Sequence, residues 1–120
     1  MAKVLVIDDS KTSRKFLEDV IKGAGHDVVG LACDGAQGLE LYKEFHPDVV
    51  TMDIIMPVMD GKDAVSAIIK EDPEARIIMV TSAGQKDNVI DCLKRGAADF
   101  IQKPYDSSLL LNTIEKVMEE

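Results

Sequence analysis

Five polar side chains at the ends of apolar segments could combine into one reactive site. Three of them are acidic, Asp8, Asp9 and Asp53, and they follow runs rich in Val, Ile and Leu. An ionised carboxylate is costly to bury alone, so these groups need a cation or a hydrogen-bond partner. Thr81 ends another apolar run and offers a hydroxyl donor, and Lys103 follows a fourth run and offers a mobile positive charge.

Carboxylates that meet at one edge of a domain repel, and each then holds its proton more tightly. A magnesium ion removes this conflict, because Mg²⁺ takes oxygen ligands and usually keeps positions for water or substrate phosphate. Asp53 could then act as a nucleophile that accepts a phosphoryl group as an acyl phosphate. Lys103 and the cation would neutralise the charge that develops during transfer. The pattern predicts a Mg²⁺-dependent phosphoryl site.

The hydrophobic pattern of the chain indicates how these residues could meet. Short continuous apolar runs, typical of strands covered on both faces, alternate five times with segments of helical spacing. We predict strands over 3–8, 26–32, 48–53, 76–81 and 99–102, and helices over 10–24, 36–45, 63–71, 86–95 and 106–119. This alternation predicts an α/β domain with a doubly wound, five-stranded parallel sheet and helices on both faces. Ligands of such sheets bind at the carboxyl ends of the strands, where the five polar residues lie.

Helical spacing marks the apolar positions of the predicted helices. In the first two helices the apolar positions include Phe16, Leu17, Tyr42 and Phe45. The two cysteines, Cys33 and Cys92, lack the spacing of a redox or metal motif, so we expect two small buried or half-buried hydrophobes.

Composition excludes several classes of protein. A length of 120 residues with 46% hydrophobic residues suits one domain over residues 1–120. A formal charge of −8 argues against a nucleic-acid partner, which would require a basic face. No apolar run approaches the roughly 20 residues of a membrane span, and no signal peptide is evident. We therefore expect a cytoplasmic protein without a membrane partner.

Several motifs together resemble a known family. They are Val-Leu-Val-Ile-Asp8-Asp9-Ser, Met52-Asp53-Ile54-Ile55-Met56-Pro57-Val-Met-Asp-Gly61, Val80-Thr81-Ser82-Ala83, Gly96-Ala97-Ala98-Asp99-Phe100 and Lys103-Pro104. In this order and spacing the sequence resembles the receiver domain of two-component response regulators, and more narrowly the CheY-like single-domain chemotaxis proteins. The likeness covers essentially the whole chain. It implies the strand order 2-1-3-4-5, which is a family property that the spacing alone does not show.

The resemblance also implies roles for the acidic residues. Asp53 would accept a phosphoryl group from the phosphohistidine of a histidine kinase. Magnesium would be bound directly by Asp9, by Asp53 and by the backbone carbonyl of Ile55, and through water by Asp8.

Lys103 would pair with the phosphorylated Asp53, and the Lys103-Pro104 peptide bond is expected to be cis. Thr81 and Phe100 resemble a switch pair, in which the hydroxyl moves to the phosphoryl group and the aromatic ring turns inward. The partner surface would lie on the fourth helix, fifth strand and fifth helix.

The function implied by this resemblance is that of a stand-alone, monomeric response regulator. A CheA-like histidine kinase would phosphorylate it, a phosphatase could oppose the kinase, and the output would reach a flagellar switch protein or another effector. Because the chain ends at Glu120, soon after the last predicted helix, we expect no effector or DNA-binding domain. The alternative is a phosphorelay shuttle that passes phosphate to a histidine phosphotransfer protein. Either protein would promote its own phosphorylation and dephosphorylation without being an enzyme for another substrate.

Three enzyme or carrier classes on this fold lack their motifs. A flavin carrier needs aromatic rings, yet the chain has no tryptophan and 4% aromatic residues. A haloacid-dehalogenase-like phosphatase needs Asp-x-Asp after the first strand, and a nucleotide hydrolase needs a Gly-x-x-x-x-Gly-Lys loop. In the resembled family, the residues at Ile55 and Ala83 influence the loss of phosphate. Neither side chain can hold an attacking water here, which predicts a phosphorylated form that lasts longer than in relatives with polar groups at these two positions.

Overall fold

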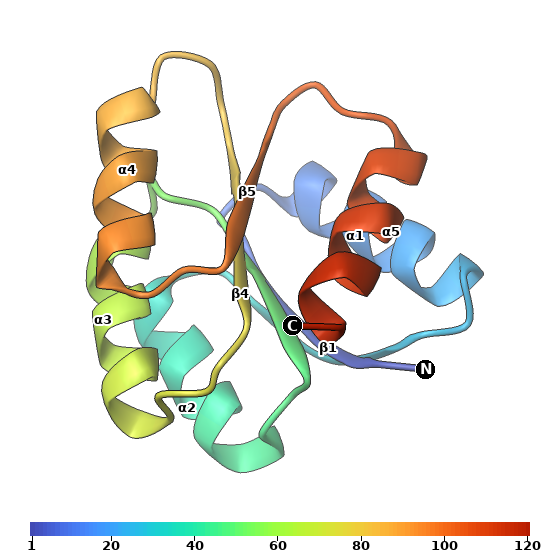
Figure 1. Cartoon of the computed structure of the whole chain (residues 1–120), viewed down its shortest axis with the longest axis horizontal. Helices are drawn as coiled ribbons and strands as arrows, with labels where there is room; N and C mark the ends of the chain where they lie inside the picture. The colour runs from blue at the N-terminus through green and yellow to red at the C-terminus, as the bar shows by residue number, and fades with distance from the viewer.

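Five strands and five helices alternate along the chain in the computed structural model, which describes all residues from Met1 to Glu120 (Figure 1). The strands are β1 (Lys3–Ile7), β2 (Asp27–Ala32), β3 (Val49–Met52), β4 (Ile77–Thr81) and β5 (Asp99–Gln102). The helices are α1 (Lys11–Gly23), α2 (Gly35–Phe45), α3 (Gly61–Glu71), α4 (Lys86–Arg95) and α5 (Ser107–Met118). None of these helices is both long and apolar enough to cross a membrane.

The strands form one parallel sheet in the order β2-β1-β3-β4-β5, which confirms the predicted fold. The register of the two central neighbours matters for the site, because Ile7 of β1 lies opposite Met52 of β3. The next residue of each strand is an aspartate, and the Asp53 amide donates a hydrogen bond to the Ile7 carbonyl at 3.0 Å. Strand pairing therefore brings Asp8 and Asp53 to the same edge.

Helices cover both faces of the sheet, with α2, α3 and α4 on one side and α1 and α5 on the other (Figure 1). Side chains of a strand alternate between the two faces. Leu5 and Ile7 accordingly pack into the core under α2 and α3, whereas Val4 and Val6 pack under α1 and α5. All four of these β1 residues are fully buried, as expected for a central strand of a parallel sheet.

Polar caps begin four of the helices close to the carboxyl ends of the strands. The side chains of Ser10, Asp34, Asp60 and Asp106 each accept a hydrogen bond from the backbone N–H three residues later. Such caps satisfy amide groups that have no partner within the helix. Asp60 makes α3 begin at Gly61, two residues before the predicted start.

The expected burial of Cys33 was wrong, and two phenylalanines of the helical pattern lie at the surface. Phe16 and Phe45 are 43% and 41% exposed. The ring of Phe16 instead meets the edge of the Tyr105 ring, with centroids 5.8 Å apart. Cys33 is exposed because it follows β2 in a loop, whereas Cys92 is buried in α4 as expected, and burial raises the pKa of its thiol to about 11.

Candidate functional site

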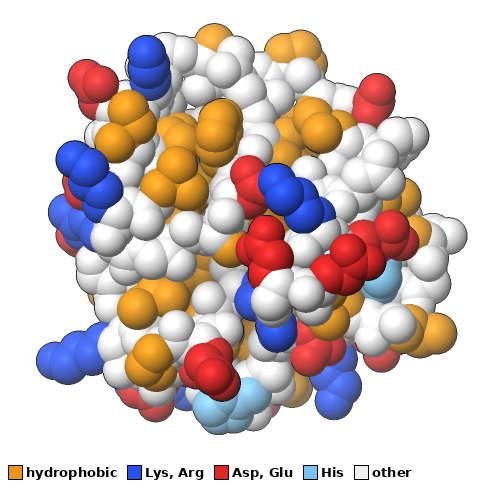
Figure 2. Space-filling model, viewed as in Figure 1, with side chains coloured by type: hydrophobic (Ala, Val, Ile, Leu, Met, Phe, Trp, Pro, Cys, Tyr) orange, Lys and Arg blue, Asp and Glu red, His pale blue; other side chains and the backbone are white.

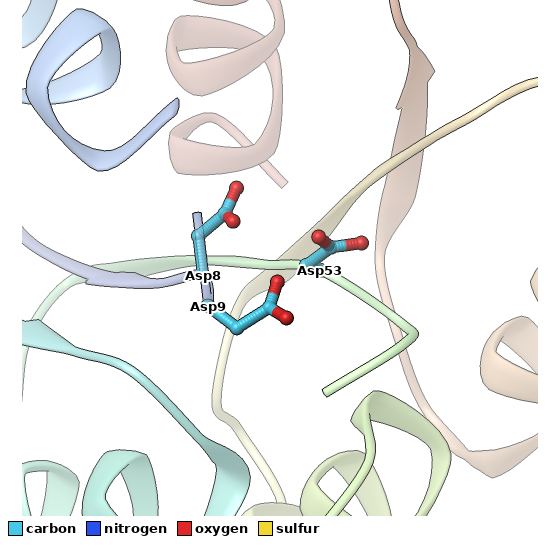
Figure 3. Close-up of side chains that lie close together, drawn as sticks. All are labelled: Asp8, Asp9 and Asp53. Carbon is cyan, nitrogen blue, oxygen red and sulfur yellow. The ribbon is translucent and has the colours of Figure 1, made fainter. Parts of the chain in front are cut away.

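The acidic residues predicted from the sequence converge at the carboxyl edge of the sheet. Asp8, Asp9 and Asp53 each offer a carboxylate oxygen, and these oxygens all lie within 4.8 Å of one another. Asp8 and Asp9 follow β1, and Asp53 follows β3. Figure 3 shows the side chains of Asp8 and Asp9 extending from their shared backbone segment toward the side on which Asp53 lies.

Asp53 is a half-buried carboxylate with few partners. Its side chain is 13% exposed, and one oxygen accepts a hydrogen bond from the Ile54 amide at 2.7 Å. Burial raises the pKa of the Asp53 carboxyl, and the negative charges of Asp8 and Asp9 raise it further, although Lys103 and the Ile54 amide oppose the rise. The negative charge of such a carboxylate is stabilised when a cation binds, and it is removed when the carboxylate reacts with an electrophile.

Asp8 is fully buried and has several partners. The Ser10 amide donates to Oδ1 at 2.8 Å, and the Ser13 hydroxyl donates to Oδ2 at 2.6 Å. The guanidinium of Arg14 donates to the backbone carbonyl of Asp8 at 2.7 Å. Sequence reasoning missed Ser13, although a hydroxyl residue in the first turn of the helix after Asp8 was the available signal.

Lys103 reaches the same edge from the loop after β5. Its Nζ lies 3.4 Å from Oδ2 of Asp8 and 3.7 Å from Oδ2 of Asp53, and the side chain is 27% exposed. The Lys103-Pro104 peptide bond is cis, as expected. The backbone amide of Lys103 donates to the Thr81 carbonyl at 2.7 Å, so the ends of β4 and β5 are joined beside the acids.

Thr81 and Phe100, the expected switch pair, lie on the neighbouring strands β4 and β5, and their switch role stays a prediction. Thr81 is 2% exposed, and its hydroxyl has no hydrogen-bond partner. A buried hydroxyl without a partner is costly, so this group favours a new acceptor nearby. The ring of Phe100 is 45% exposed. Both residues line a cavity of about 350 Å³ beside α4.

The same cavity belongs to a partly apolar surface. Figure 2 shows hydrophobic side chains gathered over α4 and beside β5. Val89, Ile90 and Leu93 of α4 line the cavity together with Phe100. Thr81 therefore lies in the same cavity as the side chains that form this exposed apolar surface, so a movement of Thr81 would change their packing.

The loop after Asp53 passes very close to the site. A Cβ at Gly61 would collide with the carbonyl oxygen of Asp53 and with Cα of Ile54, so only glycine fits this position. The Gly61 amide donates to the Ile54 carbonyl at 2.6 Å. Ile55 follows Ile54 in this loop and is 59% exposed. The role of its backbone carbonyl as a metal ligand stays a prediction.

The residues present fit a magnesium ion. The cluster offers only carboxylate oxygens, which are the ligands that hard cations prefer, and no imidazole or thiol. Asp9 is exposed and gives access from solvent, while buried Asp8 and half-buried Asp53 supply negative charge that a cation would neutralise. Asp9 and Asp53 would hold the ion directly, and Asp8 would act through water.

Residues 4–115 match the response regulator receiver domain family. The chain belongs to this family. Receiver domains bind Mg²⁺ at an acidic site, which agrees with the three carboxylates found here. Among curated relatives, the chemotaxis protein CheY of Thermotoga maritima is 46% identical over 115 residues, covering 96% of each chain.

Solved structures of receiver domains are similarly close. The response regulator domain of Thermotoga maritima CheB has a TM-score of 0.91 at 39% identity, covering 98% of this chain and 96% of the other. CheY of Borrelia burgdorferi, in a complex described as CheX-CheY-BeF3-Mg²⁺, has a TM-score of 0.91 at 38% identity. That match covers 96% of this receiver domain and 87% of the other chain.

Proposed function

We propose that this receiver domain accepts a phosphoryl group on Asp53 from a histidine kinase, in a reaction that requires Mg²⁺. One observation carries the proposal: three carboxylates and Lys103, drawn from the ends of β1, β3 and β5, converge at one edge of the sheet. Buried carboxylates with a purely structural role are usually paired with hydrogen-bond donors or cations. Here Asp53 keeps a raised pKa in spite of its partners.

The proposed reaction follows from these positions. A carboxylate oxygen of Asp53 attacks the phosphorus of a phosphohistidine, so a P–O bond forms as the P–N bond breaks. The leaving histidine nitrogen keeps the electron pair of the broken bond and takes a proton from solvent. Lys103 lies close enough to Asp53 to pair with a phosphoryl oxygen. Bound Mg²⁺ would supply further neutralisation of the phosphoryl charge.

The output of the reaction would be a changed surface. The unpartnered Thr81 hydroxyl would donate to a phosphoryl oxygen on Asp53, and the half-exposed Phe100 ring would turn toward the space that the threonine leaves. The cavity beside α4 gives this ring room to move. Phosphorylation would thereby alter the surface formed by α4, β5 and α5.

The partners we propose follow from the relatives. A relative named chemotaxis protein CheY suggests a CheA-like kinase and a flagellar switch protein, and the CheX-CheY complex suggests a phosphatase or another effector. The chain would act in the cytoplasm as a signalling protein and would not be an enzyme for a separate substrate.

The phosphoacceptor is tested with a small-molecule phosphodonor and Mg²⁺. Intact mass spectrometry should show one added phosphoryl group on the wild type and none on Asp53→Asn. Asp99→Asn is a matched control, because Asp99 pairs with Lys116 away from the acidic cluster. Phosphorylation of Asp53→Asn, or its loss in Asp99→Asn alone, would contradict the assignment.

The output is tested with beryllofluoride, which stands in for the phosphoryl group on Asp53. A flagellar switch protein should be retained by the beryllofluoride-treated chain and not by the untreated chain. Retention of neither form, together with rapid transfer of phosphate to a histidine phosphotransfer protein, would favour the phosphorelay role instead.

A further inference from the structure

We infer that Ser13 is a positioning residue of the phosphoryl site, whose hydroxyl keeps Lys103 shared between Asp8 and Asp53. The inference rests on the proposed function and extends it to a side chain outside the expected set of site residues. The Ser13 side chain makes its hydrogen bond to Asp8 and none to the phosphoacceptor, so it would act through Asp8.

The geometry around one oxygen atom carries the inference. Oδ2 of Asp8 accepts from the Ser13 hydroxyl at 2.6 Å and lies 3.4 Å from Nζ of Lys103. The other oxygen, Oδ1, accepts from the Ser10 amide. Ser13 and Lys103 therefore share one acceptor, and the serine holds the shorter contact.

The position of Ser13 is fixed by the first turn of α1. Its backbone amide donates to the side chain of Ser10 at 3.2 Å, as part of the cap of α1. The next residue, Arg14, donates to the backbone carbonyl of Asp8. The first turn of α1 is thus tied to Asp8 at both its side chain and its backbone.

The consequence for Lys103 is electrostatic. The Asp8 carboxylate is fully buried, so its charge is poorly screened by water. The serine hydroxyl satisfies part of that charge, which leaves the lysine at similar distances from Asp8 and Asp53, 3.4 and 3.7 Å. Without the hydroxyl, Oδ2 has only Lys103 as a donor, and the lysine is drawn toward Asp8 and away from the phosphoacceptor.

The first measurement is the affinity for beryllofluoride in the presence of Mg²⁺. Ser13→Ala should bind it about tenfold more weakly, the effect of one lost hydrogen bond to a charged group. Ser13→Thr keeps a hydroxyl and should restore the affinity. Thr12→Ala is the matched control, because Thr12 lies on the same turn, is exposed and makes no side-chain hydrogen bond. It should bind like the wild type.

Two further readouts separate positioning from general damage to the fold. In the metal-free protein, the side-chain NMR resonances of Lys103 should move in Ser13→Ala and stay in place in Thr12→Ala. In a Lys103→Ala background, Ser13→Ala should have no additional effect on beryllofluoride affinity, because the serine acts through the lysine.

The outcomes distinguish this inference from the proposed function. Equal beryllofluoride affinity of the wild type and Ser13→Ala, or an undiminished effect of Ser13→Ala in the Lys103→Ala background, overturns the role of Ser13 alone. If the wild type binds no beryllofluoride at all, the proposed function fails, and the inference that depends on it fails with it.

Discussion

Two edges of the same sheet hold buried or half-buried aspartates in opposite electrostatic states. At the carboxyl edge, Asp53 is surrounded by Asp8 and Asp9 and by a single lysine. At the amino edge, Asp72 accepts from the Tyr42 hydroxyl at 2.7 Å and from the Glu74 amide at 3.0 Å. No negative charge is among the groups that shift the pKa of Asp72.

The pKa values of the two acids move in opposite directions. Burial raises the pKa of Asp53, with like charges adding to the rise, whereas the hydrogen bond from Tyr42 lowers the pKa of Asp72. The folded state thus favours ionised Asp72 and disfavours ionised Asp53. A carboxylate that is hydrogen-bonded within the protein stabilises the folded state. A carboxylate without enough such partners is stabilised instead when a cation or another ligand binds to it.

Magnesium affinity is the largest difference we expect between the edges. Asp9→Ala should weaken Mg²⁺ binding by at least about tenfold, because it removes a predicted direct ligand. The measurement is a titration followed by tyrosine fluorescence or NMR. Asp72→Ala serves as the comparison, and it should leave the affinity unchanged. Equal affinity in wild type and Asp9→Ala would reject the ligand assignment.

Removing the charge of Asp53 should stabilise the metal-free protein. Asp53→Asn should raise the free energy of unfolding by about 1 kcal/mol at pH 7, within the range of common stabilising changes. Because the folded pKa of Asp53 is raised, the wild type regains stability as pH falls through that value, and the difference shrinks. Urea unfolding at several pH values measures this effect, and a variant no more stable than wild type would contradict it.

Tyr42→Phe should change the free energy of unfolding in the opposite direction from Asp53→Asn. Loss of the hydrogen bond to Asp72 should lower the free energy of unfolding by about 1 kcal/mol at pH 7. Because the folded pKa of Asp72 is lowered, its contribution is present above the unfolded pKa of about 3.9 and disappears as pH falls through the folded value. The same urea series tests this, and a deficit that grows toward acidic pH would be the wrong sign.

The smallest effect concerns the lifetime of the phosphorylated form. Ile55 and Ala83 are both exposed beside the site and carry no polar group. Ile55→Asn and Ala83→Glu should each shorten the half-life of the acyl phosphate severalfold, because a polar side chain can hold an attacking water. The half-life is measured after removal of the phosphodonor. Unchanged or slower hydrolysis in both variants would reject the idea.

The fold and the location of the site could be predicted because their signals are local. Apolar runs and helical spacing are read within ten residues, and they place Asp8, Asp53, Thr81 and Lys103 at strand ends in any parallel arrangement. Strand bounds differed from the prediction by one residue at most, while α3 began two residues early because Asp60 caps it.

The partners of each side chain were decided by the tertiary structure. Lys103 and Asp8 are 95 residues apart, and they meet because the strands are parallel, so that the carboxyl ends of β1 and β5 lie on the same side of the sheet. The Tyr42–Asp72 bond spans 30 residues and depends on how α2 and α3 pack. Periodicity also could not reveal that Ser13 faces Asp8 while Phe16 and Cys33 face solvent. The local sequence pattern determines which helix or strand a residue belongs to. The neighbours of its side chain are determined only when elements that are distant in the sequence pack together.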